Sequence, residues 1–474
     1  MQGKELLSNI GGMTVTLLGA GVSNTPLVRF LCERGAKVTV RDKKPDLGER
    51  AEAFQDAGAS LILGDAYLDN IDEDVIFRSP GFRPDTPEIA EAVGRGAILT
   101  SEIKLFLECC PCPVYAITGS DGKSTTTTVT SLILAKAFEG TDRTAFLGGN
   151  IGEPLLHRID QIRPDDAVAV ELSSFQLMDV DAPVEAAVIT NVTPNHLNWH
   201  TGMDEYIEAK SRILRRARRA VLNYGNDVTR KLGEELPIPV TFFSREAIPV
   251  DTLAAKDGAV FIEGGAIVRY GAANSEGVRE RTEIMALGDI VLPGLHNAEN
   301  YMAAAAAAWD AIAPADVREV ASTFGGVRHR LQLVAEKGGV KFYNSSIDSS
   351  PTRTAAALDA LADRSLVVIC GGYDKKIPYE PLAEAIYAHP GVRAVVTNGQ
   401  TGPKIAELLR AHPKFADGAL TLVEEPKFDD AVRRAAEIAR EGDCVLLSPA
   451  SASFDQFENF EKRGERFAEV VAAL

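Results

Sequence analysis

Cysteine, tryptophan and positive charge are all scarce in this sequence. Six cysteines and two tryptophans occur in 474 residues, and 67 acidic residues outnumber 50 basic ones, which gives a net charge of -17. So few cysteines exclude a disulfide-rich secreted domain, and the run Cys109-Cys110-Pro111-Cys112 matches no common zinc-binding spacing. We therefore expect all six thiols to be reduced and structural. The acidic balance argues against nucleic acid or an anionic membrane as a general partner.

Long apolar runs are missing as well. No stretch approaches the ~18 apolar residues that suggest a membrane span, and no basic segment followed by an apolar one opens the chain. We expect a cytoplasmic protein with no membrane partner, and a monomer. What is present is a globular composition, 45% hydrophobic and 25% charged, in a chain long enough for two to four domains.

The stretch from Val114 to Thr126 is typical of a buried strand, a phosphate-binding loop and the first turn of a helix. Gly119 and Gly122 allow the backbone to curl so that several N–H groups point inward, next to the positive end of a helix. Lys123 would reach the terminal phosphates and Ser124 would offer its hydroxyl to Mg²⁺. This combination predicts an ATP-using enzyme.

One feature of this stretch weakens the prediction and another supports it. The standard motif has a glycine where this chain has Ile117, so only its second half is met, and an ordinary glycine turn before a helix is the alternative. The helix itself is predicted from one apolar face, formed by Val129, Leu132, Ile133 and Ala137.

The N-terminal region predicts a strand–turn–helix–strand unit of the dinucleotide-binding kind. The turn Gly19-Ala20-Gly21 is followed by Asn24 where a third glycine would stand, so the evidence for NAD is weak. A sugar nucleotide diphosphate would use the same helix N-terminus, with Asp42 near its base or ribose. A further strand ends in Ser79-Pro80-Gly81, at the edge where such sheets bind ligands.

Two more strands follow the phosphate loop and end in polar residues. The strand 167–170 leads into Glu171, and the strand 187–189 leads into a loop with His196. If the three strands are parallel neighbours, their ends meet at one edge, where Glu171 and His196 would suit Mg²⁺. The alternative is that Glu171 caps a helix and His196 is an incidental loop residue. A glycine-rich turn with Asn150 is expected to line the same cleft.

A helix over about 204–219 carries Lys210 beside its apolar stripe. Desolvation at such a place favours a neutral amine, which can take up CO₂ to form a metal-binding carbamate. A lysine that extends its amine to water is the simpler interpretation from the residues alone. The basic run 212–219 is expected to be a helix end whose cations complement the dipole, because nucleic-acid binding does not fit so acidic a chain.

The last third predicts another doubly wound α/β unit, with five strands alternating with helices. Lys375 and several hydroxyl residues follow its strand ends and would form a cradle for a small anion. The expected fold is α/β with three domains: a Rossmann-like domain at 1–112, a phosphate-loop ATP-binding domain at 113–326 and a doubly wound domain at 327–474.

Several motifs in this order resemble those of the Mur ligases, and the resemblance runs from Gly19 to Gly464. The motifs are Thr-Gly-Ser-Asp-Gly-Lys-Ser-Thr at 118–125, Glu-Leu-Ser-Ser-Phe-Gln-Leu at 171–177, Asn-Val-Thr-Pro-Asn-His-Leu at 191–197, Ala209-Lys210, His296-Asn297, His329-Arg330 and Ser-Pro-Ala-Ser-Ala-Ser at 448–453. The second and the last separate the chain from other family members, and they imply D-glutamate as the added amino acid.

The resemblance implies a ligase that activates the carboxylate of UDP-N-acetylmuramoyl-L-alanine with ATP, as an acyl phosphate, and joins it to D-glutamate. It implies two Mg²⁺ ions and a CO₂-derived carbamate on Lys210, which reverses the simpler interpretation of that lysine. Lys123, Glu171, His196 and Lys210 would be catalytic, with metal ligands at Ser124, Glu171, His196 and Lys210. Nucleotide contacts are implied at Gly119, Ser120, Asp121, Gly122, Lys123, Ser124, Thr125, Asn300, Arg330 and Asp348. Substrate contacts are implied at Asp42, Ser79, Asn150, Ser349, Lys375, Ser453 and Phe460.

Two departures and two rivals accompany this resemblance. Ser345 stands where many relatives have an aspartate, for which Asp348 is the candidate replacement, and Asp121 adds negative charge to the phosphate loop. One rival is a related enzyme, another Mur ligase or a folylpolyglutamate synthase-like ligase. The other is a module that binds or hydrolyses ATP without ligating anything, although such a module has no need of a second metal site.

Overall fold

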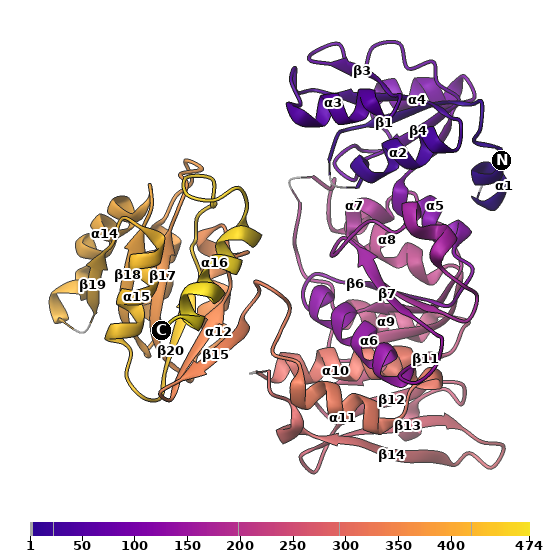
Figure 1. Cartoon of the computed structure of the whole chain (residues 1–474). Coiled ribbons are helices and arrows are strands. Elements are labelled where there is room, and N and C mark those ends of the chain that lie inside the picture. Colours follow the sequence, from indigo (N-terminus) through magenta and orange to yellow (C-terminus); the bar gives the residue numbers. More distant parts are fainter. Residues whose placement is uncertain (1–2, 22, 198, 293, 419) are drawn as a thin grey trace. The chain divides into compact units, whose positions relative to one another are not determined.

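A computed structural model describes residues 3–21, 23–197, 199–292, 294–418 and 420–474 (Figure 1). The chain divides into two compact units, one of residues 1–290 with 295–322 and the other of residues 291–294 with 323–474. Two sheets lie in the first unit and one in the second, and parallel pairing dominates all three. The predicted α/β class is therefore confirmed.

The N-terminal sheet has five parallel strands in the order β3-β2-β1-β4-β5. Its strands are β1 (Thr14–Leu18), β2 (Lys37–Asp42), β3 (Ser60–Leu63), β4 (Val75–Arg78) and β5 (Ile98–Thr100), and its helices are α1 (Gly3–Asn9), α2 (Thr25–Glu33), α3 (Glu49–Asp56), α4 (Pro87–Gly94) and α5 (Glu102–Cys109). Because β1 lies between β2 and β4, the glycine turn, Asp42 and Ser79 meet at one sheet edge. This is the Rossmann-like arrangement that the sequence predicts.

The middle sheet has nine strands in the order β14-β13-β12-β11-β10-β9-β6-β8-β7. They are β6 (Val114–Thr118), β7 (Ala145–Gly149), β8 (Ala167–Glu171), β9 (Val184–Ile189), β10 (Ala217–Asn223), β11 (Val240–Ser244), β12 (Gly258–Glu263), β13 (Ala266–Ala273) and β14 (Arg279–Ala286). The strands from β7 to β12 pair in parallel, and β12 to β14 form antiparallel hairpins. The three predicted strands β6, β8 and β9 are neighbours, with β6 in the centre.

Helices cover this sheet, and α6 is buried more widely than its sequence predicts. The helices are α6 (Lys123–Ala137), α7 (Ser174–Leu177), α8 (Met203–Ser211), α9 (Asp227–Glu235), α10 (Leu295–Ala308) and α11 (Pro314–Thr323). Leu132, placed on the apolar face by periodicity, is 38% exposed, whereas Thr126 and Thr127 are buried. The hydroxyls of Thr127 and Thr130 bond back to helix carbonyls, which satisfies them inside the protein.

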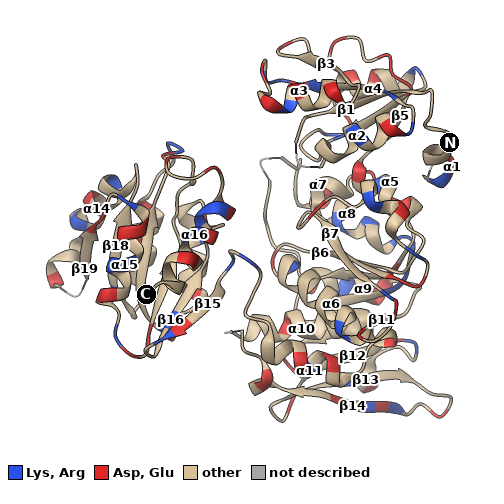
Figure 2. Cartoon of the chain, in the orientation of Figure 1, with Lys and Arg blue, Asp and Glu red and all other residues tan. Residues whose placement is uncertain are grey.

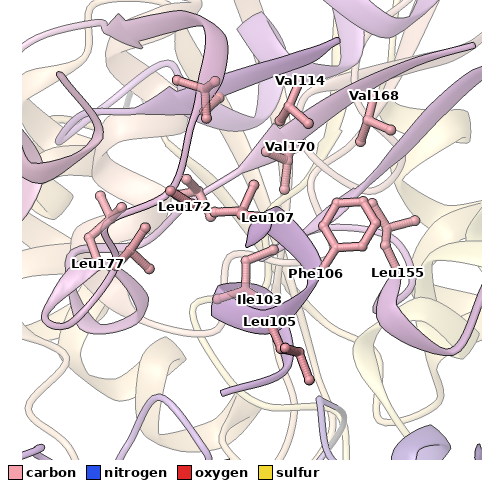
Figure 3. Close-up of a cluster of buried hydrophobic side chains, with 14 of the residues drawn as sticks. Ile103, Leu105, Phe106, Leu107, Val114, Leu155, Val168, Val170, Leu172 and Leu177 are labelled. Atoms are coloured by element: carbon pink, nitrogen blue, oxygen red, sulfur yellow. The ribbon is translucent and has the colours of Figure 1, made fainter. Parts of the chain in front are cut away.

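The helix α5 joins the two sheets of the first unit through one apolar core (Figure 3). Phe106 and Leu107 of α5 lie in the same cluster as Val114, Val168 and Leu172 of the middle sheet and its loops. The buried carboxylate of Glu102 accepts hydrogen bonds from the backbone N–H groups of Leu155 and Leu156, at 2.7 and 2.8 Å. Shared apolar burial and these bonds make the N-terminal and middle sheets a single unit.

The predicted helix at 204–219 is wrong in its second half. The helix α8 ends at Ser211, and after a short 3₁₀ turn the chain enters strand β10 at Ala217. Arg218 and Arg219 therefore do not complement a helix dipole. They form ion pairs with Glu185 and Asp310, and the parallel pairing of β10 with β9 outweighs the helical tendency of the basic run.

The second unit has six strands in the order β15-β16-β20-β17-β18-β19. Its elements are β15 (Gln332–Lys337), β16 (Val340–Asn344), α12 (Pro351–Ala360), β17 (Ser365–Gly371), α13 (Glu380–Ala388), β18 (Val392–Asn398), α14 (Gly402–Ala411), β19 (Thr421–Glu424), α15 (Phe428–Ile438), β20 (Asp443–Leu447) and α16 (Phe460–Ala472). One apolar core packs α12, α13 and α14 on the sheet and another packs α15 and α16, so the sheet is covered on both faces as predicted.

The structure bears on three features of the composition: the cysteines, the apolar runs and the charge. All six cysteines are free thiols, as predicted. Among the described residues, no helix is both long and apolar enough to cross a bilayer. Acidic and basic residues are interspersed over both units (Figure 2), so the net negative charge is spread along the chain.

Candidate active site

The phosphate loop between β6 and α6 requires glycine at two positions. Gly119 has φ +148°, and a Cβ there would overlap Thr190 Oγ1, which follows the neighbouring strand β9. Gly122 has φ +78°, and a Cβ there would lie 2.5 Å from Asn300 Oδ1. Both the backbone conformation and the lack of space therefore exclude a side chain.

The loop is held in shape by the segment that follows β9. The backbone N–H of Ser120 donates to the Asn191 carbonyl at 2.9 Å, and that of Asp121 donates to Asn191 Oδ1 at 2.9 Å. The Ser120 hydroxyl accepts from the Thr193 N–H at 2.9 Å, and Lys123 Nζ donates to the Ser120 carbonyl at 2.9 Å. Ser124, on the first turn of α6, is buried. The loop is thus preorganised before any phosphate binds.

Asn300, predicted to contact the nucleotide, supports the loop from behind. Its Oδ1 accepts from Thr126 Oγ1 at 3.1 Å, and its Nδ2 donates to Asn297 Oδ1 at 3.1 Å. Since it is buried against Gly122 and α6, the side chain fixes the start of the phosphate-loop helix. A direct nucleotide contact remains a prediction.

Glu171 lies at the end of β8, next to the end of β6. It pairs in register with Ile117, and its side chain is buried. One oxygen, Oε1, accepts from Asn150 Nδ2 at 2.8 Å, whereas Oε2 is buried without a hydrogen-bond partner among the described residues. A buried carboxylate oxygen with no partner beside a phosphate loop fits a divalent cation. Asn150, predicted to bind substrate, here orients this carboxylate.

Lys210 of α8 is fully buried beneath the phosphate loop. Its Nζ donates to the Gly119 carbonyl at 2.7 Å and lies 3.4 Å from Thr118 Oγ1. Burial, with a smaller contribution from the nearby Lys123, lowers the pKa of Lys210 from 10.5 to about 6. Because the side chain is only 2% exposed, the interpretation of a lysine extending to water is wrong. A neutral amine at this place can react with CO₂.

His196 lies in the loop after β9, with an exposed side chain and φ +55°. The centroid of its ring is 5.0 Å from that of Phe175, which follows Glu171 in the chain. Among the residues that the structure describes, no three His, Cys, Asp or Glu side chains are grouped so as to hold a metal. The proposed ligand set of Ser124, Glu171, His196 and Lys210 includes only two such residue types and stays a prediction.

At the edge of the N-terminal sheet, Asp42 and Ser79 both contact the glycine turn. Asp42 Oδ2 accepts from the Ala20 N–H at 2.8 Å, and Ser79 Oγ accepts from Asn24 Nδ2 at 3.0 Å. The side-chain oxygen of Asn24, Oδ1, is buried and has no hydrogen-bond partner in the described part of the chain. Sequence reasoning treated Asn24 only as a missing glycine, yet its amide nitrogen bonds both the Gly19 carbonyl and Ser79 Oγ, at 3.0 Å each.

In the second unit, Lys375 and Ser349 come together as predicted for the anion cradle. Lys375 Nζ lies 3.1 Å from Ser349 Oγ. Ser453, in the loop that follows β20, is buried. Asp348 is buried and accepts from Ser448 Oγ at 2.9 Å, and burial raises its pKa. The Arg330 N–H donates to the Val327 carbonyl at 3.0 Å. The nucleotide contacts of Asp348 and Arg330 remain predictions.

Sequence reasoning missed Arg463, which organises this end of the second unit. Its guanidinium is buried and donates to the Ser346 hydroxyl at 3.0 Å, the Ser346 carbonyl at 2.8 Å and the Ala452 carbonyl at 2.9 Å. It thereby ties the loop before Ser453 to the loop after β16. Its place at the third residue after Phe460, on the buried face of α16, was the available signal.

A glycine loop at a strand end, with a buried carboxylate and a buried lysine beside it, defines a nucleotide-binding α/β enzyme. Three family models match: the Mur ligase MurD-like N-terminal domain at 13–101, the Mur ligase middle domain at 117–308, and the Mur ligase glutamate ligase domain at 329–451. The chain belongs to the Mur ligase family.

Relatives and solved structures agree with this assignment. The UDP-N-acetylmuramoylalanine--D-glutamate ligase of Acetivibrio thermocellus is 43% identical over 99% of this chain and 98% of that protein. The enzyme of the same name from Clostridium perfringens is 39% identical over 98% of each chain. In fold, the chain is similar to UDP-N-acetylmuramate-alanine ligase MurC from Thermotoga maritima, with a TM-score of 0.56 at 18% identity over 97% and 99% of the two chains.

Proposed function

We propose that this protein joins D-glutamate to UDP-N-acetylmuramoyl-L-alanine with the consumption of ATP, a step in peptidoglycan precursor synthesis and so in cell-wall growth and division. The observation that carries the proposal is the phosphate loop with two buried side chains beside it: Glu171 at the end of the neighbouring strand β8, and Lys210 bonded to the Gly119 carbonyl. The names of the relatives, which match the chain over almost its whole length, support the choice of substrates.

The residues of the chain divide the work of this reaction. The loop from Gly119 to Ser124 binds the triphosphate through its N–H groups, and Lys123 neutralises charge at the γ-phosphate while the substrate carboxylate attacks it. The acyl phosphate that results is attacked by the amine of D-glutamate, which expels phosphate and forms the amide. The two Mg²⁺ ions would be held by Ser124 and Glu171 and by His196 and carbamylated Lys210, and when bound they offset phosphate charge.

Lys210 suits carbamate formation because its amine is neutral near pH 7. An unprotonated amine adds to CO₂ with loss of one proton, and the product is an anion in place of a neutral amine. The added carboxylate oxygens give a buried position that carries no charge of its own the means to attract Mg²⁺. The carbamate is therefore part of the proposal, and the low pKa of Lys210 supports it.

The two other substrates would bind at the edges of the two other sheets. Asp42, Ser79 and the unused acceptor of Asn24 would receive the uridine diphosphate portion of the first substrate. Lys375, whose Nζ lies 3.1 Å from Ser349 Oγ, would bind a carboxylate of D-glutamate. Ser349, Ser453 and Phe460 would contact the same substrate. We propose a cytoplasmic monomer with no nucleic-acid or membrane partner.

The amino acid is the part of the proposal most open to direct test. Phosphate release from ATP should be measured with UDP-N-acetylmuramoyl-L-alanine and a panel of amino acids. We expect release with D-glutamate and none with L-lysine, diaminopimelate or L-glutamate. A response to one of these three in place of D-glutamate would identify another ligase of the family. Phosphate release without any amino acid would favour a simple ATP hydrolase.

A further inference from the structure

The carboxylate of Glu205, on the first turn of α8, joins three segments of the first unit. Its Oε1 lies 2.8 Å from His200 Nδ1 and accepts from the Thr201 N–H at 3.3 Å, and its Oε2 accepts from the Thr201 hydroxyl at 3.0 Å. Both oxygens also accept from Arg83, at 3.0 and 2.9 Å. Few side chains of the site have so many partners.

Arg83 reaches this carboxylate from the N-terminal sheet. It lies in the loop after β4, four residues beyond Ser79, and grips Glu205 with two parallel N–H bonds. The same guanidinium donates to the Trp199 carbonyl at 3.1 Å and pairs with Asp85. A forked arginine–carboxylate pair fixes direction as well as distance. The edge of the N-terminal sheet is thus tied to the middle sheet beside its phosphate loop.

His200 links Glu205 to Ser174, which lies three residues after Glu171. Its ring is buried, with Nδ1 toward Glu205 and Nε2 2.9 Å from Ser174 Oγ. Burial lowers the pKa of His200, so the neutral ring donates from Nδ1 to the carboxylate and accepts at Nε2 from the serine hydroxyl. Arg83 lowers the pKa of Glu205 to about 2, which keeps its carboxylate charged.

The loop 191–200, which carries His196, is therefore anchored at both ends. At its start Asn191 and Thr193 bond to the phosphate loop, and at its end Trp199 and His200 are held by Arg83 and Glu205. The helix α8 is anchored in the same way, because Tyr206, next to Glu205, places its hydroxyl 3.0 Å from Ser120 Oγ. Lys210 lies on the same helix, four residues after Tyr206.

We propose that Glu205, held by Arg83, is a positioning residue for the ligation reaction: it sets the loop of His196 and the helix of Lys210 against the phosphate loop. The proposal rests on the proposed function, since it concerns the same site. Because Arg83 follows the predicted substrate contact Ser79, the link also relates the substrate-binding edge of the N-terminal sheet to the phosphate site. Among the described residues, neither side chain bonds to the phosphate loop, so we expect the effect to be on turnover more than on ATP affinity.

The test is Glu205→Gln, which keeps the shape of the side chain and removes its charge. We expect kcat for D-glutamate-dependent phosphate release to fall about 10- to 100-fold, the range for a misplaced site, while the KM for ATP and the binding of ATP to the enzyme change little. The matched control is Glu208→Gln on the same helix, whose carboxylate is exposed and pairs with Arg215. This control should behave as the wild type does.

A second comparison separates positioning from loss of folding. Arg83→Met should lower kcat to a similar extent, and the double variant should be no worse than either single one, because both substitutions break one link. Arg83→Lys, which keeps the charge without the fork, should recover part of the activity. An unchanged kcat in Glu205→Gln, additive losses in the double variant, or loss of ATP binding together with thermal stability would each overturn the proposal.

Failure of the proposed function gives a different result. Wild-type enzyme that ignores D-glutamate but turns over another amino acid contradicts the substrate assignment alone. The same set of variants assayed with that amino acid then decides the role of Glu205 by the same criteria.

Discussion

Two buried basic side chains, a lysine in the first unit and an arginine in the second, differ in what burial does to them. Lys210 and Arg463 are each 2% exposed, and both donate to backbone carbonyls: Lys210 to Gly119, and Arg463 to Ser346 and Ala452. Burial lowers the pKa of both side chains, to about 6 for the lysine and about 10 for the arginine. Near pH 7 the lysine is therefore mostly neutral and the arginine is charged.

The difference shows how the choice of cation decides the use of a buried position. A lysine amine that has lost its proton is a nucleophile, and in the mechanism we propose it reacts with CO₂. An arginine keeps its charge and its planar set of donors, and here it clamps two loops around Ser453. On this proposal, similar burial yields a reactive group in one unit and a structural one in the other.

The largest effect is expected from Lys210→Met. Without the amine no carbamate forms, and we expect ligation to fall roughly 100-fold or more, as when a charge-stabilising group is removed from a site. ATP binding should persist because the phosphate loop is untouched. Phosphate release and nucleotide titration measure the two, and isotopically labelled CO₂ followed by NMR reports the carbamate of the wild type. Lys231→Met, at an exposed lysine of α9, is the control.

Normal ligation by Lys210→Met would remove the carbamate from the mechanism. It would also remove the functional half of the contrast with Arg463, since both cations would then be structural.

Arg463→Lys tests the other half, and its main effect is on stability. A lysine cannot supply all the bonds that the guanidinium makes to Ser346 and Ala452, and each buried acceptor left unpaired costs about 1–3 kcal/mol. We expect the free energy of unfolding of the second unit to fall by about 3 kcal/mol in total. Urea unfolding measures it, with Arg466→Lys, at a half-exposed arginine of the same helix, as the reference. Equal stability of the two variants would show that Arg463 is replaceable.

The pH dependence of stability should reveal Lys210 directly. Its pKa is lower in the folded than in the unfolded protein, so between about pH 6 and 10.5 the unfolded chain binds more protons and the stability of the fold rises with pH. The contribution is at most about 1.4 kcal/mol per pH unit. The free energy of unfolding of the wild type should therefore rise relative to that of Lys210→Met as pH is raised from about 7 to 8 in CO₂-free buffer. Parallel curves for the two proteins would mean that the amine is not desolvated.

Glu102 extends the comparison to a buried anion, with a smaller effect of opposite sign. Burial raises its pKa from 4.5 to about 7, against the bonds from Leu155 and Leu156 that favour the charged form. Its stabilising contribution is present below about pH 4.5 and is lost as pH rises toward 7. We expect wild type to lose about 1 kcal/mol relative to Glu102→Gln between pH 6 and 7, measured by urea unfolding at each pH. A constant difference would contradict the raised pKa.

Local patterns predicted where several of these residues lie. The glycines of the phosphate loop, the strand ends that carry Glu171 and His196, and the pairing of Lys375 with Ser349 all follow from strand ends in parallel sheets. Predictions failed where a long-range contact outweighed a local preference. The basic run 212–219 looked helical and became strand β10 because β9 was available to pair with it.

Other residues of the site carried no local signal. Arg83 and Glu205 are 122 positions apart, so no local pattern indicates that they form the forked link between two sheets. Asn24 was noted for the glycine that it replaces, and its buried free acceptor became visible only when Ser79 and the turn were in place.

By itself the sequence determined the phosphate loop, the strands that lead into Glu171 and His196 and the identity of the charged residues, because each depends on neighbours within a few positions of the chain. The tertiary structure alone decided which charges are buried and what faces them: the neutral amine of Lys210, the open oxygen of Glu171 and the clamp of Arg463. Desolvation acts through every atom packed around a group, whatever its distance along the chain, and periodicity cannot report it.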